Sequence, residues 1–480
     1  MAISNKSERD EEHVEIFDVA GVPTIKVPLQ DEDLSYGRTG VRGVIESPYV
    51  FGAALLASMG GFSFGYDQGV ISIIIVMDAF HDVFPEARNG FGKGFMTGML
   101  EFGAFLGCFF FPWLADKISR KKALSVVVAI FNVGAILQTA AVNYEMLVLG
   151  RTIGGNGIGT LALGAPLYIS EISPPALRGT LLVLETCSIV LGVVISYWIT
   201  FATRHLSGEI SFRRPLGLQM VSATMVDLGI HIFPYSPRWL AMVGRNDDAL
   251  ASLAKLRRLP DNDHRVQAEH YGIVAEARFQ KLVQERRHPK LAGIKLEIAS
   301  WFDFFRKSTW RRTASDEMSL IMAGVFNTLQ LVAMVQATNK PTIIDKVGRR
   351  PLAIWGGAGG AVFWGVMAVL VGLFSSNAIR SKGAALSTAT NWISNFLVGV
   401  VTPPMIESLG FGMYVFYGYW CLVASIWAYF MVPETMGKSL EQMDEVFKDK
   451  SGHEERELQR VAAEQVLREL SPGQSRDKSP

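Results

Sequence analysis

The sequence is poor in cysteine and in charged side chains. Only three cysteines occur in 480 residues, Cys108, Cys187 and Cys421, and each lies inside an apolar run. This pattern implies no disulfide framework, and we expect all three to be small buried apolar residues. Charged residues make up 19% of the chain, below the roughly 25% of soluble domains. The net charge of +1 gives no reason to expect a nucleic-acid partner.

Motifs of enzymes and of secreted proteins are also missing. No metal-ligand cluster and no nucleophile–base motif stands out, so we expect no enzyme activity, no metal and no cofactor. The glycines at 154, 155, 157 and 159 follow Arg151 inside an apolar run and not a strand, which favours tight helix packing over dinucleotide binding. The acidic N-terminus lacks the features of a cleavable signal peptide, so the first apolar helix is expected to direct membrane insertion.

Long apolar runs, in contrast, are abundant. A membrane-spanning helix needs about 20 mostly apolar residues. Ten runs reach that length: 48–77, 94–115, 123–142, 146–169, 180–203, 215–233, 318–339, 352–376, 384–406 and 409–432. The last four of them contain no Asp, Glu, Lys or Arg. The sequence therefore predicts an all-α integral membrane protein that crosses the lipid bilayer many times.

Positive charge gathers in the loops that follow the second, fourth and sixth runs. These charges are Lys117, Arg120, Lys121, Lys122, Arg178, Arg245, Lys255, Arg257 and Arg258. The positive-inside rule makes this side cytoplasmic, and both chain ends fall on it. We therefore expect a cytoplasmic tail (1–47), a six-helix bundle (48–234), a charged linker with short helices (235–316), a second bundle (317–433) and a charged cytoplasmic tail (434–480).

An internal repeat relates the two halves, but the second copy is shorter. Asp116 to Lys121 recurs as Asp345 to Arg350, Ala176 to Arg178 recurs loosely as Ala378 to Arg380, and Pro234 corresponds to Pro433. These three repeated positions serve as landmarks. The second and third lie 56 residues apart in the first half (178 to 234) and 53 in the second (380 to 433). The first and second lie 62 residues apart in the first half (116 to 178) but only 35 in the second (345 to 380). Before the first landmark, the second half has room for one span instead of two. Each place lacks about one helix, which predicts six plus four spanning helices.

Several motifs in the same order resemble the sugar porter family of the major facilitator superfamily, particularly its fungal members, over about residues 48–447. They are Gly60 to Asp67, Gly150 to Gly159, Pro166 to Gly179, Pro234 to Leu240, Asp345 to Arg350 and Pro433 to Gly437. The resemblance implies a major facilitator fold, in which two helical bundles with cytoplasmic N- and C-termini carry sugar across the membrane.

The departures from this family coincide with the short intervals. The family's seventh helix carries a Gln-Gln pair and an Asn that bind sugar, and its tenth carries an aromatic wall and a Pro-Ser-Glu motif; both segments are absent. The chain is therefore expected to lack the seventh and tenth helices and to have about ten spans instead of twelve. In addition, the glycines of the first cytoplasmic motif fall on Pro112 and Ser119, and the sugar-binding Gln of the fifth helix falls on Thr186.

Asp67 and Arg151 are charged residues inside apolar runs. A lone charge at mid-membrane costs about 2.5–3.5 kcal/mol on insertion scales, so the two are expected to pair. The resemblance implies that Asp67 takes up the coupled proton while Arg151 stabilises its ionised form; a purely structural ion pair is the alternative. Glu101 is either a second proton site or a structural partner. Asp227 and His231, spaced i and i+4, are expected to form a local pair.

Asn391 and Asn395 are spaced one turn apart on an apolar helix, with Trp392 between them. Amides can donate to and accept from hydroxyls, and an indole offers a flat apolar platform. The resemblance implies sugar contact here and, with less support, at Asn327, Phe64 and Thr186. Hydrogen bonding between helices is the alternative for the amides, and packing is the alternative for Phe64.

Charges in the cytoplasmic loops resemble the family's inner-face ion-pair network, which holds the two halves together when the outside is open. They are Asp116, Arg120, Glu171, Arg178, Arg349, Arg350, Arg380 and Glu434. Solvated positive-inside charge is the alternative for the arginines.

The sequence thus predicts a carrier of a monosaccharide or polyol in the plasma membrane, working as a proton symporter by alternating access. Its partners would be the sugar, protons and lipid. The two helix-sized gaps favour a rival from another class: a truncated, non-transporting paralogue, or an alternative or mispredicted gene product. A sugar sensor ranks third.

Overall fold

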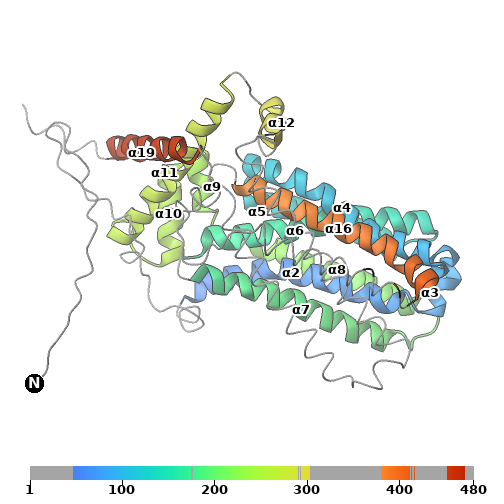
Figure 1. Cartoon of the computed structure of the whole chain (residues 1–480). Helices are drawn as coiled ribbons and strands as arrows, with labels where there is room; N and C mark the ends of the chain where they lie inside the picture. Colours follow the sequence, from blue (N-terminus) through green and yellow to red (C-terminus); the bar gives the residue numbers. More distant parts are fainter. Residues whose placement is uncertain are drawn as a thin grey trace, which may run out of the picture.

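In the computed structural model, the described residues are 47–174, 177–289, 291, 293–302, 380–410, 412, 416 and 451–470 (Figure 1). Every regular element in these ranges is a helix, in agreement with the expected all-α class. The predicted runs 318–339 and 352–376, and nearly all of 409–432, lie outside the described residues, as does the N-terminal tail.

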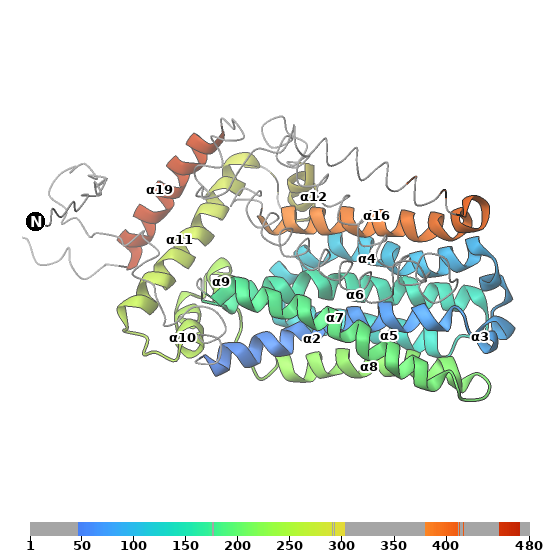
Figure 2. The same ribbon diagram turned by 60° about the horizontal axis from the view of Figure 1, so that its bottom comes forward.

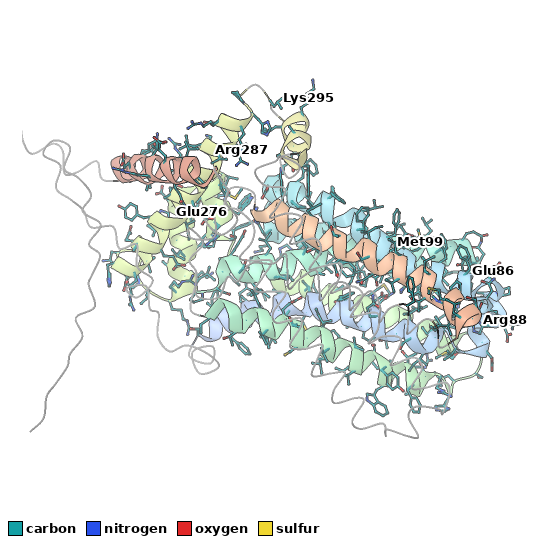
Figure 3. All side chains as sticks on the ribbon, viewed as in Figure 1. Glu86, Arg88, Met99, Glu276, Arg287 and Lys295 are labelled. Carbon is teal, nitrogen blue, oxygen red and sulfur yellow. The ribbon has the colours of Figure 1, made fainter. Side chains whose placement is uncertain are left out.

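Six long helices lie side by side and form most of the rod seen in Figure 2. They are α2 (Pro48–Ile74), α4 (Gly90–Ile118), α5 (Arg120–Thr139), α6 (Tyr144–Ile172), α7 (Arg178–Thr203) and α8 (Ile210–Ile230). The short helices α3 (Asp78–Val83) and η2 (Pro85–Arg88) connect α2 to α4. In Figure 3 the charged residues Glu86 and Arg88 lie at one end of this rod, and Glu276, Arg287 and Lys295 lie beyond the other.

Capping residues decide where these helices begin. The Asn89 side chain accepts a hydrogen bond from the Gly92 backbone N–H at 2.6 Å, and Asn143 accepts one from Met146 at 2.8 Å. Each cap satisfies a backbone donor that has no partner within the helix. This is why α4 begins at Gly90 and α6 at Tyr144, before the apolar runs predicted to start at 94 and 146.

The outer surface of the rod is apolar, as a lipid environment requires. Four described helices are long and apolar enough to cross a membrane: Tyr49–Ile74, Gly90–Ile118, Arg120–Thr139 and Thr180–Thr203. On α7 the exposed side chains include Val183, Val190, Leu191 and Trp198. Cys187 is exposed on the same helix, which corrects the expectation that it is buried, whereas Cys108 is buried as expected.

Glycines bring the helices of the rod into close contact. A Cβ added to Gly155 of α6 would lie 1.9 Å from the Leu100 carbonyl oxygen of α4, and one added to Gly103 would lie 2.0 Å from the Thr152 carbonyl oxygen. No side chain fits at either place. The glycine-rich stretch of α6 is therefore a helix-packing surface, as its sequence context predicts.

Helix α16 (Arg380–Leu409) comes from the second half of the chain and packs along α4 (Figures 1 and 2). Phe102 of α4 meets Phe396 of α16 with ring centroids 5.4 Å apart. Near the start of α4, a Cβ on Gly94 would lie 2.8 Å from the carbonyl oxygens of Gly399 and Val400. The two halves of the sequence are thus in direct contact along this pair of helices.

The linker and the tail contribute further helices at one end of the rod. These are α9 (Pro237–Met242), α10 (Asn246–Arg257), α11 (His264–Arg287), α12 (Ile294–Phe302) and α19 (Ser451–Leu470). Helix α19 packs on α11, where Ala462 and Val466 are buried and Arg278 pairs with Glu469 at 3.1 Å. The sequence predicted a charged linker with short helices and a charged tail, and it did not indicate that the tail docks on the linker.

Candidate transport site

Asp67 of α2 and Arg151 of α6 form an ion pair that is buried inside the rod. Arg151 Nη1 donates to Asp67 Oδ1 at 3.0 Å and to Oδ2 at 3.2 Å, and both side chains are at most 1% exposed. The predicted pairing is therefore present. Arg151 Nε and Nη2 are also buried, and they have no hydrogen-bond partner within the described ranges. The guanidinium thus keeps unused donors although its charge is balanced.

Glu101 of α4 lies next to this ion pair. The Gln68 side chain donates from Nε2 to Glu101 Oε1 at 2.6 Å, and Gln68 directly follows Asp67 on α2. Glu101 is buried, and its Oε2 has no hydrogen-bond partner in the part of the chain that the structure describes. Sequence reasoning noted Glu101 but missed Gln68, because an isolated glutamine in an apolar run shows no partner in the sequence.

Glu185 of α7 is a further buried carboxyl, and sequence reasoning missed it. Its side chain is 6% exposed, and Oε1 would lie 2.7 Å from a Cβ placed on Gly61 of α2. Glycine at position 61 thus leaves the space that this carboxyl occupies. The signal that could have found it is a charged residue inside the apolar run 180–203, since such residues are costly in a membrane.

Phe64 of α2 and Trp392 of α16 meet edge to face, with ring centroids 5.1 Å apart. Phe64 lies one helical turn before Asp67. Beside this aromatic pair, Asn391 Oδ1 and Asn395 Oδ1 are buried and have no hydrogen-bond partner among the described residues. Trp392 Nε1 is also buried and has no hydrogen-bond partner in the described part of the chain. Polar atoms from α16 are therefore gathered against α2 and α4 without partners.

The remaining predicted sugar contacts are less defined. Thr186 lies on α7 and donates its hydroxyl to the Leu182 carbonyl of its own helix at 3.3 Å. Asn327 lies outside the described residues. The structure thus brings Phe64 into contact with Trp392, which lies on α16 between Asn391 and Asn395, whereas the hydrogen bond of Thr186 stays within its own helix.

At the linker end of the rod, Arg120 joins two carboxylates. It bonds Asp116 at 2.7 Å and Glu171 at 3.0 Å, and its own side chain is buried. All three residues belong to the first half. Of the other predicted network members, Arg349, Arg350 and Glu434 lie outside the described residues, and the side chains of Arg178 and Arg380 are not described. The contact between halves that a gate needs therefore stays a prediction.

The linker helices are attached to this end by bonds that the sequence did not reveal. Arg257 of α10 donates to the Ile172 carbonyl at the end of α6 at 2.8 Å, and it pairs with Glu269 at 2.6 Å. The Trp239 indole N–H donates to the Asp116 carbonyl at 3.0 Å, and Lys121 Nζ donates to the His231 and Phe233 carbonyls at 2.8 Å each. Basic groups at helix C-termini satisfy the last carbonyls.

Asp227 of α8 and His231, which directly follows this helix, lie 3.5 Å apart, so the predicted local pair is present. Ser125 of α5 lies 3.2 Å from His231 Nε2. Within the described residues, no three His, Cys, Asp or Glu side chains gather in a way that could hold a metal ion.

Comparisons with known proteins give this geometry its context. The family model described as "Sugar (and other) transporter" matches residues 53–377 and 363–447. The high-affinity glucose transporter of Kluyveromyces lactis is 28% identical over 84% of this chain and 85% of its own length. The hexose transporter HXT10 of Saccharomyces cerevisiae is 28% identical over 84% of this chain and 86% of its own length. The sugar transporter STL1 of the same yeast is 28% identical over 82% of this chain and 80% of its own length.

Solved structures agree on the fold. The proton:xylose symporter XylE bound to 6-bromo-6-deoxy-D-glucose superposes with a TM-score of 0.60 and 21% identity, covering 84% of this chain and 99% of that one. The inward open xylose transporter XylE from E. coli superposes with a TM-score of 0.57 and 23% identity over 83% and 99%. At these identities the likeness shows the major facilitator fold alone. Together with the family match, it shows that this chain belongs to the sugar porter family of the major facilitator superfamily, as a multi-pass membrane transporter and not an enzyme.

Proposed function

We propose that this protein carries a hexose-like monosaccharide or a polyol across a membrane. The observation that carries the proposal is the pair of buried amide oxygens, Asn391 Oδ1 and Asn395 Oδ1, left without partners beside the Phe64–Trp392 pair. Buried polar atoms are normally hydrogen-bonded, and sugar hydroxyls are donors of the right kind. The aromatic rings offer apolar surface for the carbon face of a sugar. The names of the yeast relatives, which are glucose, hexose and sugar transporters, support the same substrate class.

Proton coupling is the second part of the proposal. Asp67 would take up a proton, and Arg151 would stabilise its ionised form through the two bonds described above. Alternating access would rock the bundle 48–234 against the bundle 317–433, with the linker 235–316 and both tails in the cytoplasm and the protein in the plasma membrane. The charged residues of the predicted inner-face network would close the cytoplasmic side. They are Asp116, Arg120, Glu171, Arg178, Arg349, Arg350, Arg380 and Glu434. Thr186 and Asn327 would add sugar contacts.

Uptake of radiolabelled hexose in a transport-null yeast tests the proposal directly. We expect uptake by the wild-type protein, and a loss of about tenfold or more when Asn391→Ala leaves sugar hydroxyls unpaired. Ser394→Ala on the same helix is the matched control, because the Ser394 hydroxyl is already bonded to the Thr390 carbonyl at 2.8 Å. Absence of uptake by a protein that is folded and present at the cell surface would reject the proposal.

The rival hypothesis, a non-transporting product that lacks the seventh and tenth helices, rests on the two short intervals in the repeat. Sequencing the messenger RNA across codons 310–345 and 370–382 decides between them. Extra coding sequence at both places would restore twelve spans and favour the transporter. A message that encodes the present chain would support ten spans and strengthen the rival.

A further inference from the structure

The Asp67–Arg151 pair has a neighbour that the proposed mechanism does not use. Two carboxyls, Asp67 and Glu101, lie beside one guanidinium, and Gln68 links the second carboxyl to the segment that carries the first. Arg151 and Asp67 both act electrostatically on Glu101. If both carboxyls were ionised, this buried group would carry one uncompensated negative charge inside the apolar rod, which is unfavourable.

The packing of α4 against α6 keeps these groups at one level. Gly103 and Gly155 allow residues 100–103 of α4 to touch residues 152–155 of α6, with no room for a methyl group at either glycine. Glu101 lies within this contact, and Arg151 directly precedes its α6 segment. Among the other helices packed here, α2 contains one charged residue, Asp67. Glu407 of α16 lies beside Gly90, which is about three turns of α4 away from Glu101. Asp67 and Arg151 are thus the charged groups that face Glu101 among the described residues.

Unused hydrogen-bonding atoms mark the group as able to rearrange. Arg151 Nε and Nη2 and Glu101 Oε2 are all buried without a partner within the ranges that the structure describes. A guanidinium that serves only one carboxylate in a fixed pair would leave these donors permanently unpaired, at an appreciable energetic cost. They can instead serve a second carboxylate whenever Asp67 becomes neutral.

We propose that Asp67 and Glu101 share a single proton around Arg151. One carboxyl is a carboxylic acid while the other is the carboxylate that balances the guanidinium, so the total charge of the group stays at zero. When Asp67 accepts a proton, Glu101 gives one up and becomes the counterion of Arg151. Only the part of this inference that concerns transport rests on the proton coupling proposed above; the shared proton is a property of the protein without sugar.

Infrared titration of the purified protein in detergent tests the shared proton. All variants carry Glu185→Gln, because Glu185 is the other buried carboxyl without an ion-pair partner among the described residues and could contribute its own acid band. The apolar runs 318–339, 352–376 and 409–432 contain no carboxyl and so cannot contribute one. We expect a carboxylic-acid C=O band near neutral pH that disappears in Glu101→Gln. We expect the band to disappear in Asp67→Asn as well, because Glu101 must then ionise to balance Arg151. Glu145→Gln, an exposed carboxyl at the start of α6, is the control and should leave the band unchanged.

Persistence of the acid band in Asp67→Asn would overturn the proposal, since Glu101 would then hold its proton independently of Asp67. Persistence in Glu101→Gln would overturn it too. If Glu101→Gln fails to fold, Glu101→Asp provides the test, because it keeps the acid and should keep the band and its dependence on Asp67.

Transport assays in proteoliposomes separate this inference from the proposed function. Proton-driven accumulation of sugar should fall about tenfold or more in Glu101→Gln, while sugar counterflow, which needs no net proton movement, continues. Wild-type protein that moves sugar without any response to a proton gradient would contradict the proposed coupling, and the infrared result would still decide whether the proton is shared. Unchanged accumulation by Glu101→Gln would exclude a role for Glu101 in coupling.

Discussion

Ser119 separates α4 from α5 with a backbone φ of 101°, a conformation that side chains rarely adopt. Its hydroxyl accepts a hydrogen bond from the Lys122 N–H at 3.2 Å and so caps α5. The sequence showed that a family glycine is replaced here, and the structure shows the conformation that favours glycine at this position. Backbone strain of this kind costs on the order of 1–3 kcal/mol.

Ser119→Gly should therefore stabilise the protein. Glycine removes the backbone strain at position 119 but also removes the hydroxyl that caps α5. Glycine at a cap position costs only a few tenths of a kcal/mol, so the gain from the released strain is larger. We expect a net gain of about 1 kcal/mol and an apparent unfolding temperature in detergent raised by about 1–3 °C. Ser72→Gly in α2, where the backbone is helical, is the control and should lower stability by about 0.5 kcal/mol. A lower unfolding temperature for Ser119→Gly would contradict the strain argument.

His270 of α11 is a second residue whose surroundings determine its chemistry. Its side chain is buried, and burial holds its pKa below the usual 6.5, although Asp247 acts in the opposite direction. The folded protein therefore binds this proton less readily than the unfolded chain. Stability contributed by the neutral imidazole is present above about pH 6.5 and is lost as the pH falls below that value.

His270→Leu should thus reduce the acid sensitivity of the protein. Unfolding temperatures measured at about pH 7.5 and pH 5.5 should differ less for the variant than for the wild type, because leucine carries no proton in either state. His264, which is exposed at the start of the same helix, provides the control variant His264→Leu. An equal acid response of wild type and His270→Leu would show that the imidazole is not a source of this sensitivity.

At the scale of elements, glycine contacts decide which helices become neighbours. Gly155→Ala would place a methyl group against the Leu100 carbonyl oxygen of α4, so α4 and α6 would have to separate. Overpacking of this kind typically costs about 1–3 kcal/mol. We expect a lower unfolding temperature and less protein at the cell surface. Gly272→Ala on α11 is the matched control: its Cβ would meet nothing within 4 Å, so the change should gain about 0.5–1 kcal/mol.

At the scale of the molecule, the contact between α4 and α16 joins the two halves of the chain. A Cβ on Gly399 would lie 3.6 Å from the Gly98 Cα, so the two backbones approach closely enough for cysteines at these positions to be cross-linked. Alternating access requires this contact to open, because the two bundles rock against each other. A covalent bond across it should therefore stop the transport cycle.

Gly98→Cys combined with Gly399→Cys tests this requirement. Oxidation of the double variant should reduce sugar uptake about tenfold or more, and a reductant should restore it. Each single variant, treated in the same way, is the control. Full uptake by a protein that is demonstrably cross-linked would show that α4 and α16 stay together throughout the cycle, contrary to the proposed rocking of the two bundles.

Much of the fold could be predicted because lipid imposes simple rules on sequence. The apolar runs predicted the bounds of α2, α4, α5, α6, α7 and α8 to within a few residues. The free-energy cost of an unpaired charge in a membrane predicted that Asp67 pairs with Arg151. Helix ends were less accurate, because caps such as Asn89 and not apolar composition determine them. Gln68 was missed, since its partner comes from another helix, and Glu185 was missed although a charged residue inside the apolar run 180–203 signals a buried carboxyl.

The sequence by itself determined the helices, the membrane setting and the family, because spanning segments must be apolar throughout and family motifs follow one another along the chain. Only the tertiary structure decided which of these groups meet: Gln68 with Glu101, Phe64 with Trp392, and the tail helix α19 with α11. The physical reason is that these contacts depend on the side-by-side packing of helices. A few glycines set that packing by letting two backbones approach, and residues far apart in the sequence then come within bonding distance.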